Sequence, residues 1–439
     1  MFHPNEDPAS PPRAYTGAAP PAPPCFLLNG AHRTSVAVVG AGFTGLSAAL
    51  HLAEAGVDVT VLEAREIAWG ASGRAFGQVV PYLKHDHADI LRHYGAERGA
   101  RIVDAVASGP QRVAGLVEKH GIACNLRRTG LIFAAHSPSG HRTLKARVAY
   151  WQHRGAAVEM LDVEATRTAI GSSAYRNALL DHRGVHLNPF AYARGLAVAA
   201  VKAGARICEA APAQSLRRAN GQWIIGVGPH TVTADSVIIA TNAYTGNLSP
   251  GLSQTVIPVR GYGAVSEPLS DNVRRSILPG GQALTDTRKL HSGVRILADG
   301  RLHASLDGPA FGQQAAPYIG PLNARMARLF PQLGRVAWAE TWSGFIAVTP
   351  DQFPRVHSLG PNLYTGLGYS GRGIAAATMI GAELAARVRG VPDADLVFPA
   401  SDLRPIAWHR FAAVPVGALL RWWRMREAID DMRWLNRRQ

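Results

Sequence analysis

The stretch SVAVVGAGFTGLSAALHLAEAGVDVTVLE, residues 35–63, decides the fold class of this chain. It opens with the apolar run Val-Ala-Val-Val, which is typical of a strand buried on both faces of a parallel sheet. A glycine-rich turn follows, then an apolar helix that ends at Gly56, and then a second strand, Val57 to Leu62. The sequence therefore predicts a βαβ unit, the building block of a parallel sheet.

Gly40, Gly42 and Gly45 give this unit the spacing G-x-G-x-x-G of a dinucleotide-binding turn. The first glycine permits a tight turn, the second lets pyrophosphate approach the backbone, and the third lets the helix pack on the strand. The N-terminus of the helix offers unpaired N–H groups to the phosphates. Glu63 ends the second strand, where its carboxylate suits ribose hydroxyls and would repel a 2′-phosphate. We therefore expect a dinucleotide other than NADP.

A second glycine-rich turn, 366–371, lies between an expected strand and a long alanine-rich helix. No acid-tipped strand follows it, because residues 389–393 read RGVPD, so this turn does not predict a second dinucleotide site. We expect instead that the helix N-terminus and Arg372 face the flavin edge that gains negative charge on reduction. A tightly packed structural turn is the alternative. A single dinucleotide unit favours FAD over NAD.

Four segments, taken in order, resemble the D-amino-acid-oxidase superfamily of FAD-dependent oxidoreductases. They are residues 40–63, WGASGR at 69–74, ATNAY at 240–244 and GYSGRG at 368–373. The WGASGR run and the pair Tyr15-Thr16 place the chain nearest the γ-glutamylputrescine oxidase-like branch. The resemblance spans nearly the whole chain, and it implies FAD bound in an extended pose.

The resemblance also implies which residues hold FAD, from its adenosine end to the flavin ring. They are Gly40, Gly42, Phe43, Thr44, Gly45, Glu63, Ser72, Gly73, Arg74, Gln78, Ala213, Thr241, Asn242, Gly368, Gly371, Arg372, Gly373 and Ile374. Some members of the superfamily tether FAD to a cysteine or a histidine. Here no cysteine follows Cys208, and residues 70–78 contain no histidine. We therefore expect non-covalent FAD.

Three positions depart from the pattern of the branch. Phe76 stands where a glycine is common, Arg372 where a histidine is common, and the segment DGRLHAS, 299–305, lacks paired glycines. A phenylalanine near the flavin is expected to narrow the substrate space. The departures concern the substrate and leave the cofactor expectation intact.

The chemistry implied by the resemblance is oxidation of an amine or amino acid. A neutral amine gives a hydride to the flavin, the imine hydrolyses, and oxygen or another acceptor reoxidises the flavin; a dedicated general base is not required. The candidate catalytic residues at the substrate wall are Tyr262, His303, Trp342 and Tyr369, and Arg260, Arg288 and Arg301 could clamp a carboxylate. For each of them a structural role is the alternative, because buried Tyr, Trp and His side chains usually belong to the core.

The net charge of +15 leaves other classes of function open. Of 46 basic residues five are lysine, and the arginines are scattered in doublets, which favours attraction for an anionic cofactor and substrate over a nucleic-acid surface. An RNA-modifying flavoenzyme acting on a tRNA-linked amine, a quinone-linked amino-acid dehydrogenase and a flavin protein without turnover remain alternatives. We expect a small-molecule amine or amino acid as partner and no nucleic acid.

The two ends of the chain contain no apolar run long enough for a signal peptide or a bilayer span. The basic, aromatic segment after residue 410 either lies at a membrane surface, giving weak peripheral contact, or folds back on the catalytic domain; its acidic residues favour the second. Three scattered cysteines fit a reducing compartment, so we expect a cytoplasmic protein. His85, Asp86, His87 and Asp89 have metal-ligand spacing, but we interpret them as a solvated loop and expect no metal.

Strands of the parallel type occur near the start, in the middle and near the end of the chain, with helical segments expected over residues 88–170 and a β-meander over 255–310. This order predicts an α/β plus α+β fold, in which a discontinuous Rossmann-like FAD-binding domain carries an inserted mixed-sheet substrate domain. The expected ranges are 1–33 for a proline-rich extended arm; 34–90, 187–248 and 340–400 for the FAD-binding domain; 91–186 and 249–339 for the substrate domain; and 401–439 for the C-terminal segment.

Overall fold

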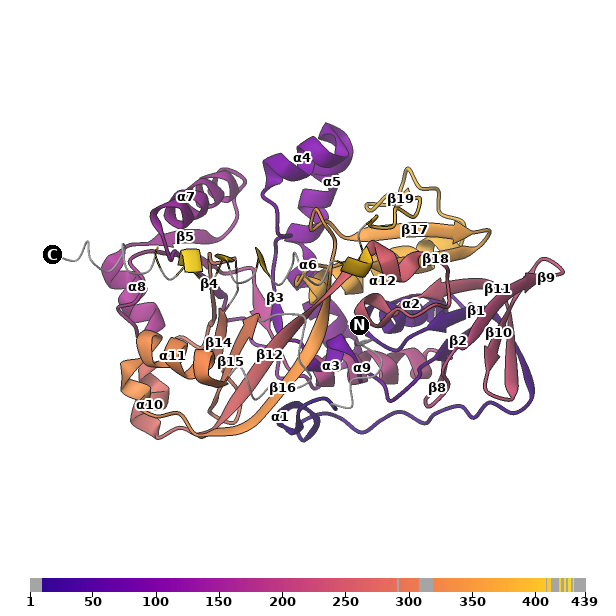
Figure 1. The fold of residues 1–439 in the computed structure, drawn as a ribbon, viewed down its shortest axis with the longest axis horizontal. Helices are drawn as coiled ribbons and strands as arrows, with labels where there is room; N and C mark the ends of the chain where they lie inside the picture. Colours follow the sequence, from indigo (N-terminus) through magenta and orange to yellow (C-terminus); the bar gives the residue numbers. More distant parts are fainter. Residues whose placement is uncertain are drawn as a thin grey trace.

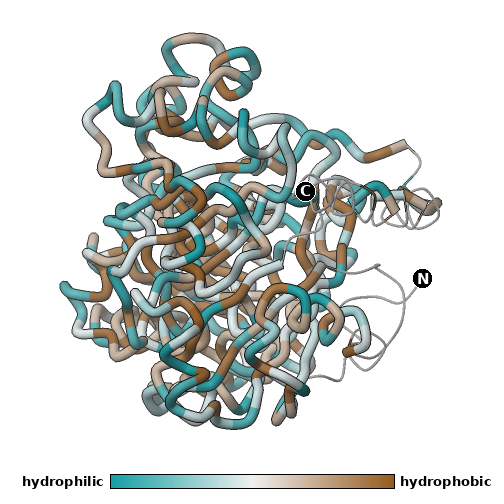
Figure 2. The backbone as a smooth tube through the Cα atoms, turned by 90° about the vertical axis from the view of Figure 1, so that its left-hand side faces the viewer, coloured by the Kyte–Doolittle hydropathy of each residue, from teal (hydrophilic) through white to brown (hydrophobic). Residues whose placement is uncertain are grey.

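The computed structural model describes residues 10–289, 292–307 and 319–407, and in the C-terminal segment 409–411, 418, 419, 422, 423, 425–427 and 429 (Figure 1). Two large sheets organise the molecule, the first on the right of Figure 1 and the second on the left. Apolar segments gather in the interior of the trace, and hydrophilic ones lie toward its outside (Figure 2).

The first sheet has the strand order β19-β17-β18-β11-β1-β2-β8, with the hairpin β9–β10 beside β11. Its strands are β1 (Ala31–Val39), β2 (Val59–Leu62), β8 (Arg206–Cys208), β9 (Ser215–Ala219), β10 (Gln222–Val227), β11 (His230–Ile239), β17 (Arg355–Gly360), β18 (Leu363–Leu367) and β19 (Ala400–Ser401). β1 pairs in parallel with both β2 and β11, and β11 pairs in parallel with β18. Three distant segments thus build one parallel core, which confirms the predicted discontinuous α/β fold.

The residues of β1 alternate between two apolar layers. Val36 and Val38 pack in the core cluster that contains Leu46 and Ile380, whereas Ala37 and Val39 belong to a second cluster on the other face. The helices that pack on the Val36 and Val38 face of the sheet are α2 (Phe43–Glu54), α9 (Pro189–Lys202) and α12 (Gly373–Val388). Burial on both faces explains why β1 reads as an unbroken apolar run.

The second sheet has the order β16-β12-β15-β14-β13-β4-β6-β5. Its strands are β4 (Leu131–Ala134), β5 (Val158–Leu161), β6 (Ala178–Asp181), β12 (Ile257–Pro268), β13 (Ala283–Asp286), β14 (Ser292–Ile296), β15 (Arg301–Asp307) and β16 (Trp338–Val348). β16 begins before residue 340 and pairs with β12, so the chain returns to the first sheet only after this strand. Leu302, Ala304 and Leu306 of β15 face an apolar cluster with α11 (Ile319–Leu329).

The region expected to be helical, residues 88–170, contains strands as well as helices. The helices of the first half are α3 (Ala71–Arg74), α4 (His87–Tyr94), α5 (Ala96–Ala107), α6 (Gly109–His120), α7 (Pro138–His153) and α8 (Val163–Ile170), and α10 (Asp271–Ser276) follows later. β4 and β5 lie within residues 88–170, so the expectation of a purely helical segment was wrong. An apolar run of four residues is too short to distinguish the 3.6-residue period of a helix from the two-residue period of a strand.

The N-terminal arm is docked on the molecule from residue 10 onward. The backbone N–H groups of Arg13 and Ala14, in α1 (Arg13–Thr16), donate to the Glu340 carboxylate at 2.7 and 3.0 Å. Tyr15 is only 1% exposed, and the side-chain amide of Asn188 donates to its carbonyl oxygen at 2.9 Å. The first nine residues lie outside the described part of the chain. The arm therefore brings one aromatic side chain into the core.

Among the helices that the structure describes, none combines the length and apolarity needed to cross a bilayer.

Candidate active site

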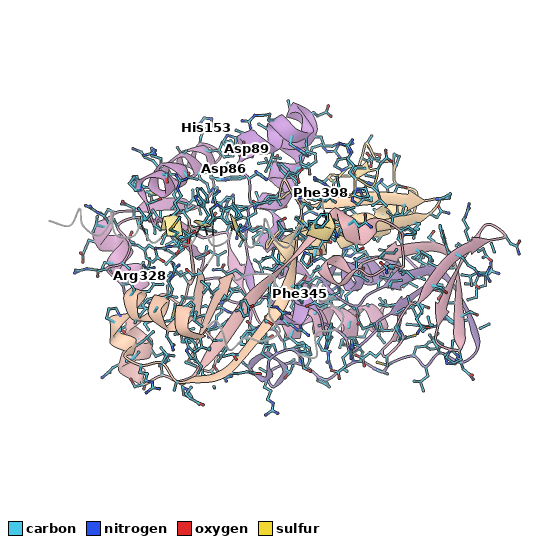
Figure 3. The ribbon with its side chains drawn as sticks, viewed as in Figure 1. Asp86, Asp89, His153, Arg328, Phe345 and Phe398 are labelled. Carbon is cyan, nitrogen blue, oxygen red and sulfur yellow. The ribbon has the colours of Figure 1, made fainter. Side chains whose placement is uncertain are left out.

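A cavity of about 1170 Å³ lies between the two sheets and is lined by residues from both. One end is formed by the turn 40–44 and Glu63, and the other by aromatic and polar side chains of β15 and β16. Figure 3 shows Phe345, another lining residue, near the centre of the molecule. The cavity therefore connects the predicted dinucleotide turn with the predicted substrate wall.

The turn after β1 leaves room where side chains would block it. Gly40 has φ +105°, and a Cβ there would lie 3.0 Å from the Ala240 carbonyl oxygen. A Cβ on Gly42 would lie 2.9 Å from Oγ of Ser72, which accepts the Phe43 N–H at 3.0 Å. A bare backbone at Gly42 lets a phosphate approach the start of α2, so this cradle fits a dinucleotide.

Gly45 and Gly73 serve packing rather than the cavity. A Cβ on Gly45 would lie 1.9 Å from the Gly40 carbonyl oxygen, and one on Gly73 would lie 2.2 Å from that of Ala68. The lining formed by the described residues includes neither of them, nor Gly368. These glycines let neighbouring elements approach each other closely, as expected for the third glycine of the motif.

The Glu63 carboxylate is fixed at the end of β2 by two backbone groups. Its Oε2 accepts the Ala41 N–H at 2.7 Å, and its Oε1 accepts the Arg65 N–H at 2.9 Å. Burial raises the pKa of this carboxyl, although the two N–H donors act in the opposite direction. The group faces the cavity with a set orientation, as a ribose partner requires.

The middle of the cavity is built around Arg74. Its guanidinium lies 4.4 Å from the centre of the Trp69 ring and donates to the Ser343 carbonyl and the Tyr244 hydroxyl at 3.4 Å. Nearby, Asn242 Oδ1 accepts the Gly368 N–H at 3.0 Å, which joins the segments that follow β11 and β18. This hydrogen bond therefore holds the lining residues of both segments in a fixed position relative to the dinucleotide turn.

The N-termini of α2 and α12 both line the cavity. A Cβ on Gly381, in α12, would lie 2.4 Å from the Thr44 carbonyl oxygen, so the two helices pack with almost no side chain between them. Ser370 and Gly371 take positive φ values of +49° and +83° in the turn that starts α12. Two helix N-termini carry partial positive charge toward one region, which suits an anionic or reduced cofactor.

The far end of the cavity is walled by aromatic rings. The Phe76 ring lies 4.6 Å from that of His303, and the His303 ring lies 5.1 Å from that of Trp342. Glycines make room for these rings, since a Cβ on Gly263 would meet Trp342 at 2.6 Å and one on Gly293 would meet Phe76 at 2.8 Å. Phe76 stands where a glycine is common in the branch, and Gly293, which lies against the Phe76 ring, leaves room for it.

The predicted catalytic residues all line the cavity but make different contacts. The Trp342 indole N–H donates to the Arg74 carbonyl at 3.1 Å, and Tyr369 lies in the turn between β18 and α12. The Tyr262 side chain also packs in the apolar cluster behind the second sheet. Except for Gly45, Gly73 and Gly368, the residues predicted to bind FAD line the cavity as well. Their individual roles stay predictions.

The three arginines considered for a carboxylate clamp have other partners. Arg260 donates to Ser343 Oγ at 2.5 Å, buried Arg288 pairs with Asp286, and Arg301 pairs with Asp299 at 2.6 Å. None of them belongs to the lining that the described residues form. The expectation of a clamp at these positions is therefore corrected.

The cations that do line the cavity were not predicted, except Arg74 and Arg372. Within the described lining, the basic residues are Arg65, Arg74, Lys84, Lys289 and Arg372, and the acidic residue is Glu63 at the adenosine end. Lys84 and Lys289 are two of only five lysines in the chain. The lining formed by the described residues therefore carries an excess of positive charge.

The predicted solvated loop at 85–89 has structural contacts. Asp86 pairs with Arg147 at 2.6 Å, and His87 stacks on Tyr150 at 3.5 Å between ring centres. His87 and Asp89 belong to α4, so the expectation of a loop is corrected there; Figure 3 shows Asp86 and Asp89 in the upper part of the molecule. Across the described ranges, His, Cys, Asp and Glu nowhere gather in a group of three or more that could hold a metal ion.

The described residues of the C-terminal segment contact the catalytic domain. Leu419 and Trp423 line the cavity, and Glu427 Oε1 accepts the Lys289 N–H at 2.9 Å. No local signal in the sequence connects these residues with the cavity, because their partners lie more than a hundred positions earlier.

The sequence comparisons agree with this geometry. Residues 35–387 match the family profile described as "FAD dependent oxidoreductase", DAO. Gamma-glutamylputrescine oxidoreductase from Escherichia coli (strain K12) is 32% identical over 92% of this chain and 95% of that protein. The probable oxidoreductase OrdL from Rhizobium meliloti is 31% identical over 87% and 90%.

The crystal structure of glycine oxidase from Geobacillus kaustophilus has a similar fold. It superposes with a TM-score of 0.68 at 24% identity and covers 81% of this chain and 95% of that one. The predicted resemblance is thereby confirmed over most of the sequence and in the fold. This chain belongs to the DAO family of FAD-dependent oxidoreductases, and FAD is its cofactor.

Proposed function

We propose that the protein oxidises an amine or amino acid at the carbon next to nitrogen, with FAD bound non-covalently. The observation that carries this proposal is the single cavity that joins the dinucleotide cradle to an aromatic enclosure with cationic lining. Related proteins support it by name, since they include a gamma-glutamylputrescine oxidoreductase and glycine oxidases. An aromatic, partly cationic enclosure suits a small organic molecule with an anionic group.

Gly40, Gly42, Glu63 and the start of α2 would hold the adenosine-diphosphate part of FAD, and the turn before α12 would hold the flavin. A flavin bound there would supply the acceptor for the hydride that leaves the substrate carbon. Phe76 and Trp342 exclude water and limit the orientations of the substrate. Lys84, Lys289 and Arg372 attract the anionic group of the substrate. The amine group therefore points toward the part of the cavity wall that these three residues do not form. Water then hydrolyses the imine product.

The test is anaerobic mixing of the purified protein with a panel of amines and amino acids, while the absorbance of oxidised flavin is followed. Loss of this absorbance with one compound identifies the substrate, and its fast recovery in air marks an oxidase rather than a dehydrogenase. If flavin is bound but no compound reduces it, the proposed reaction is wrong. Acid precipitation should release the flavin; flavin retained on the protein would contradict non-covalent binding.

We place the protein in the cytoplasm as part of this proposal. Its three cysteines are free, and Cys124 and Cys208 are buried, as expected where thiols stay reduced. We also expect neither nucleic-acid binding nor stable membrane attachment. Cell fractionation and a salt-dependent RNA-binding assay check both expectations.

A further inference from the structure

His303 lies at the substrate end of the cavity and is held from behind by two residues. It is 1% exposed and lies on β15 between Val265 of β12 and Arg295 of β14. Its Nδ1 is 3.1 Å from the Tyr15 hydroxyl and 3.3 Å from Arg295 Nε. Its Nε2 is also buried, but no described residue forms a hydrogen bond with it. In this cavity-lining residue Nδ1 therefore has hydrogen-bond partners, whereas Nε2 has none among the described residues.

Arg295 determines which nitrogen carries the proton. A guanidinium can only donate, so Nδ1 must accept the Arg295 Nε–H and cannot itself be protonated. The Tyr15 hydroxyl accepts from Arg295 Nη2 at 3.0 Å and lies 3.1 Å from the Ala75 carbonyl oxygen, to which it can donate. None of these arrangements requires a proton on Nδ1. A neutral imidazole in this setting therefore carries its hydrogen on Nε2.

The surroundings also keep the ring neutral. Burial lowers the pKa of His303 well below its usual value, and the positive charge of Arg295 acts in the same direction. The titratable or charged groups in contact with it are Tyr15 from α1 and Arg295 from β14. Val265 from β12 and the rings of Phe76 and Trp342 complete the contacts. None of these carries a carboxylate that would favour an imidazolium.

We propose that His303 is a fixed hydrogen-bond donor that presents Nε2–H to a carboxylate or carbonyl oxygen of the substrate. It does not remove a proton from the substrate ammonium, because its only lone pair is on Nδ1 and is occupied by Arg295. Tyr15 and Arg295 are positioning residues that set this tautomer, and the N-terminal arm is thereby part of the active site. This inference rests on the proposed function for the nature of the substrate.

A buried N–H without an acceptor is unfavourable, so a bound oxygen completes the site. An ammonium has no lone pair and cannot satisfy this donor, whereas a carboxylate can. The lysines of the lining attract the same group, and the donor then fixes its position. His303 therefore separates substrates that have an oxygen acceptor near the amine from simple alkylamines.

The first test compares His303→Gln, which keeps an N–H donor near the Nε2 position, with His303→Leu, which removes it. The matched control is His182→Gln, at a histidine that pairs with Glu159 on the surface. The probes are acetate and methylammonium, titrated into the FAD-loaded protein while the flavin spectrum and the heat of binding are recorded. We expect acetate to bind about 10- to 100-fold more weakly to His303→Leu, the loss of one hydrogen bond to a charged group, and within about 10-fold of the parent to His303→Gln.

Unchanged acetate affinity in a folded, flavin-containing His303→Leu protein overturns the proposal. With the substrate found by flavin reduction, KM should rise in His303→Leu while kcat stays within a few-fold, and His303→Gln should keep the pH profile of the parent. A loss of about 100-fold or more in kcat for His303→Gln, together with loss of the acid limb, would instead identify His303 as a base and overturn the proposal.

The second test does not depend on the reaction. In ¹⁵N-histidine-labelled protein, the two-bond nitrogen–proton correlations distinguish the tautomers, and His303→Gln assigns the signal. We expect the Nε2–H pattern for His303 and no titration between about pH 5.5 and 8. The Nδ1–H pattern, or titration near the ordinary histidine pKa, refutes the assignment. If the Nε2–H pattern is found but no amine reduces the flavin, the proposed function fails while the donor assignment stands.

Discussion

The hydroxyl groups of Thr44 and Tyr369 lie 2.6 Å apart in a buried contact between the start of α2 and the turn that precedes α12. These residues are 325 positions apart in the chain, and each follows the end of a parallel strand. Burial raises the pKa of Tyr369 above its usual value, so the hydroxyl stays protonated and can donate. This hydrogen bond fixes the spacing of the two helix N-termini that border the cavity.

Replacement of Tyr369 by phenylalanine should therefore loosen the flavin site. The Thr44 hydroxyl loses its partner, which costs about 1–2 kcal/mol of stability, and the affinity for FAD should fall about 10-fold. Thermal unfolding of the loaded protein and FAD titration of the apoprotein check this. The control is Tyr364→Phe on β18. An unchanged FAD affinity in Tyr369→Phe would show that the contact serves stability alone.

Two glycines of the dinucleotide turn, Gly42 and Gly45, should respond differently to alanine. In Gly45→Ala the new Cβ meets the backbone of Gly40, which must move, so the apoprotein should lose about 2–3 kcal/mol of stability. In Gly42→Ala the new Cβ meets only Oγ of Ser72, a side chain that can rotate. Gly42→Ala should therefore keep the stability of the apoprotein and lose FAD affinity. Denaturation of both apoproteins and FAD titration separate the effects; equal loss of stability in both would contradict this division.

His186 should make the fold sensitive to mild acid. Burial, aided by the charge of Arg295, lowers its pKa from 6.5 to about 4. The unfolded chain takes up this proton first, so the associated stability is complete above about pH 6.5 and is lost as the pH falls toward 4. The shift corresponds to about 3 kcal/mol at most.

His186→Gln keeps a donor for the Gly281 carbonyl, which lies 2.9 Å from Nε2, and removes the titrating group. Its free energy of unfolding should fall less between pH 7 and 4.5 than that of the parent. Urea denaturation at several pH values measures this, with His182→Gln as the surface control. Parallel pH curves for His186→Gln and the parent would rule out this origin of acid sensitivity.

Two neighbouring tryptophans allow a sharp test of the C-terminal segment. Trp423 lines the cavity, whereas Trp422 is 45% exposed. Trp423→Ala should open the cavity to solvent, raising both the KM and the quenching of flavin fluorescence by iodide several-fold. Trp422→Ala should change neither. The same result for both variants would mean that the segment does not cover the cavity in solution.

The parts that were predicted correctly depend on local sterics. At Gly40 and Gly42 a side chain would collide with a neighbouring carbonyl or hydroxyl, so the spacing of the glycines alone specifies the turn.

The parts that were missed depend on partners distant in sequence or on local ion pairs. Arg288 and Arg301 seemed available for a substrate, but each pairs with an aspartate two residues earlier. Lys289 and Trp423 line the cavity from segments that carry no motif. Tyr15 belongs to a pair that marked the branch, but nothing near it in the sequence indicated its contact with His303. Their roles follow from tertiary packing, which overrides any signal of a few residues.

The pairing of β1 with β11, and of β11 with β18, has a consequence for biosynthesis. The register of the first sheet needs Leu363 opposite Val237, so the strands made first wait for a strand near the end of the chain. Contacts of such long sequence separation close slowly, and the ribosome has released most of the protein before they can form. The nascent chain therefore exposes the edge of β11 during synthesis.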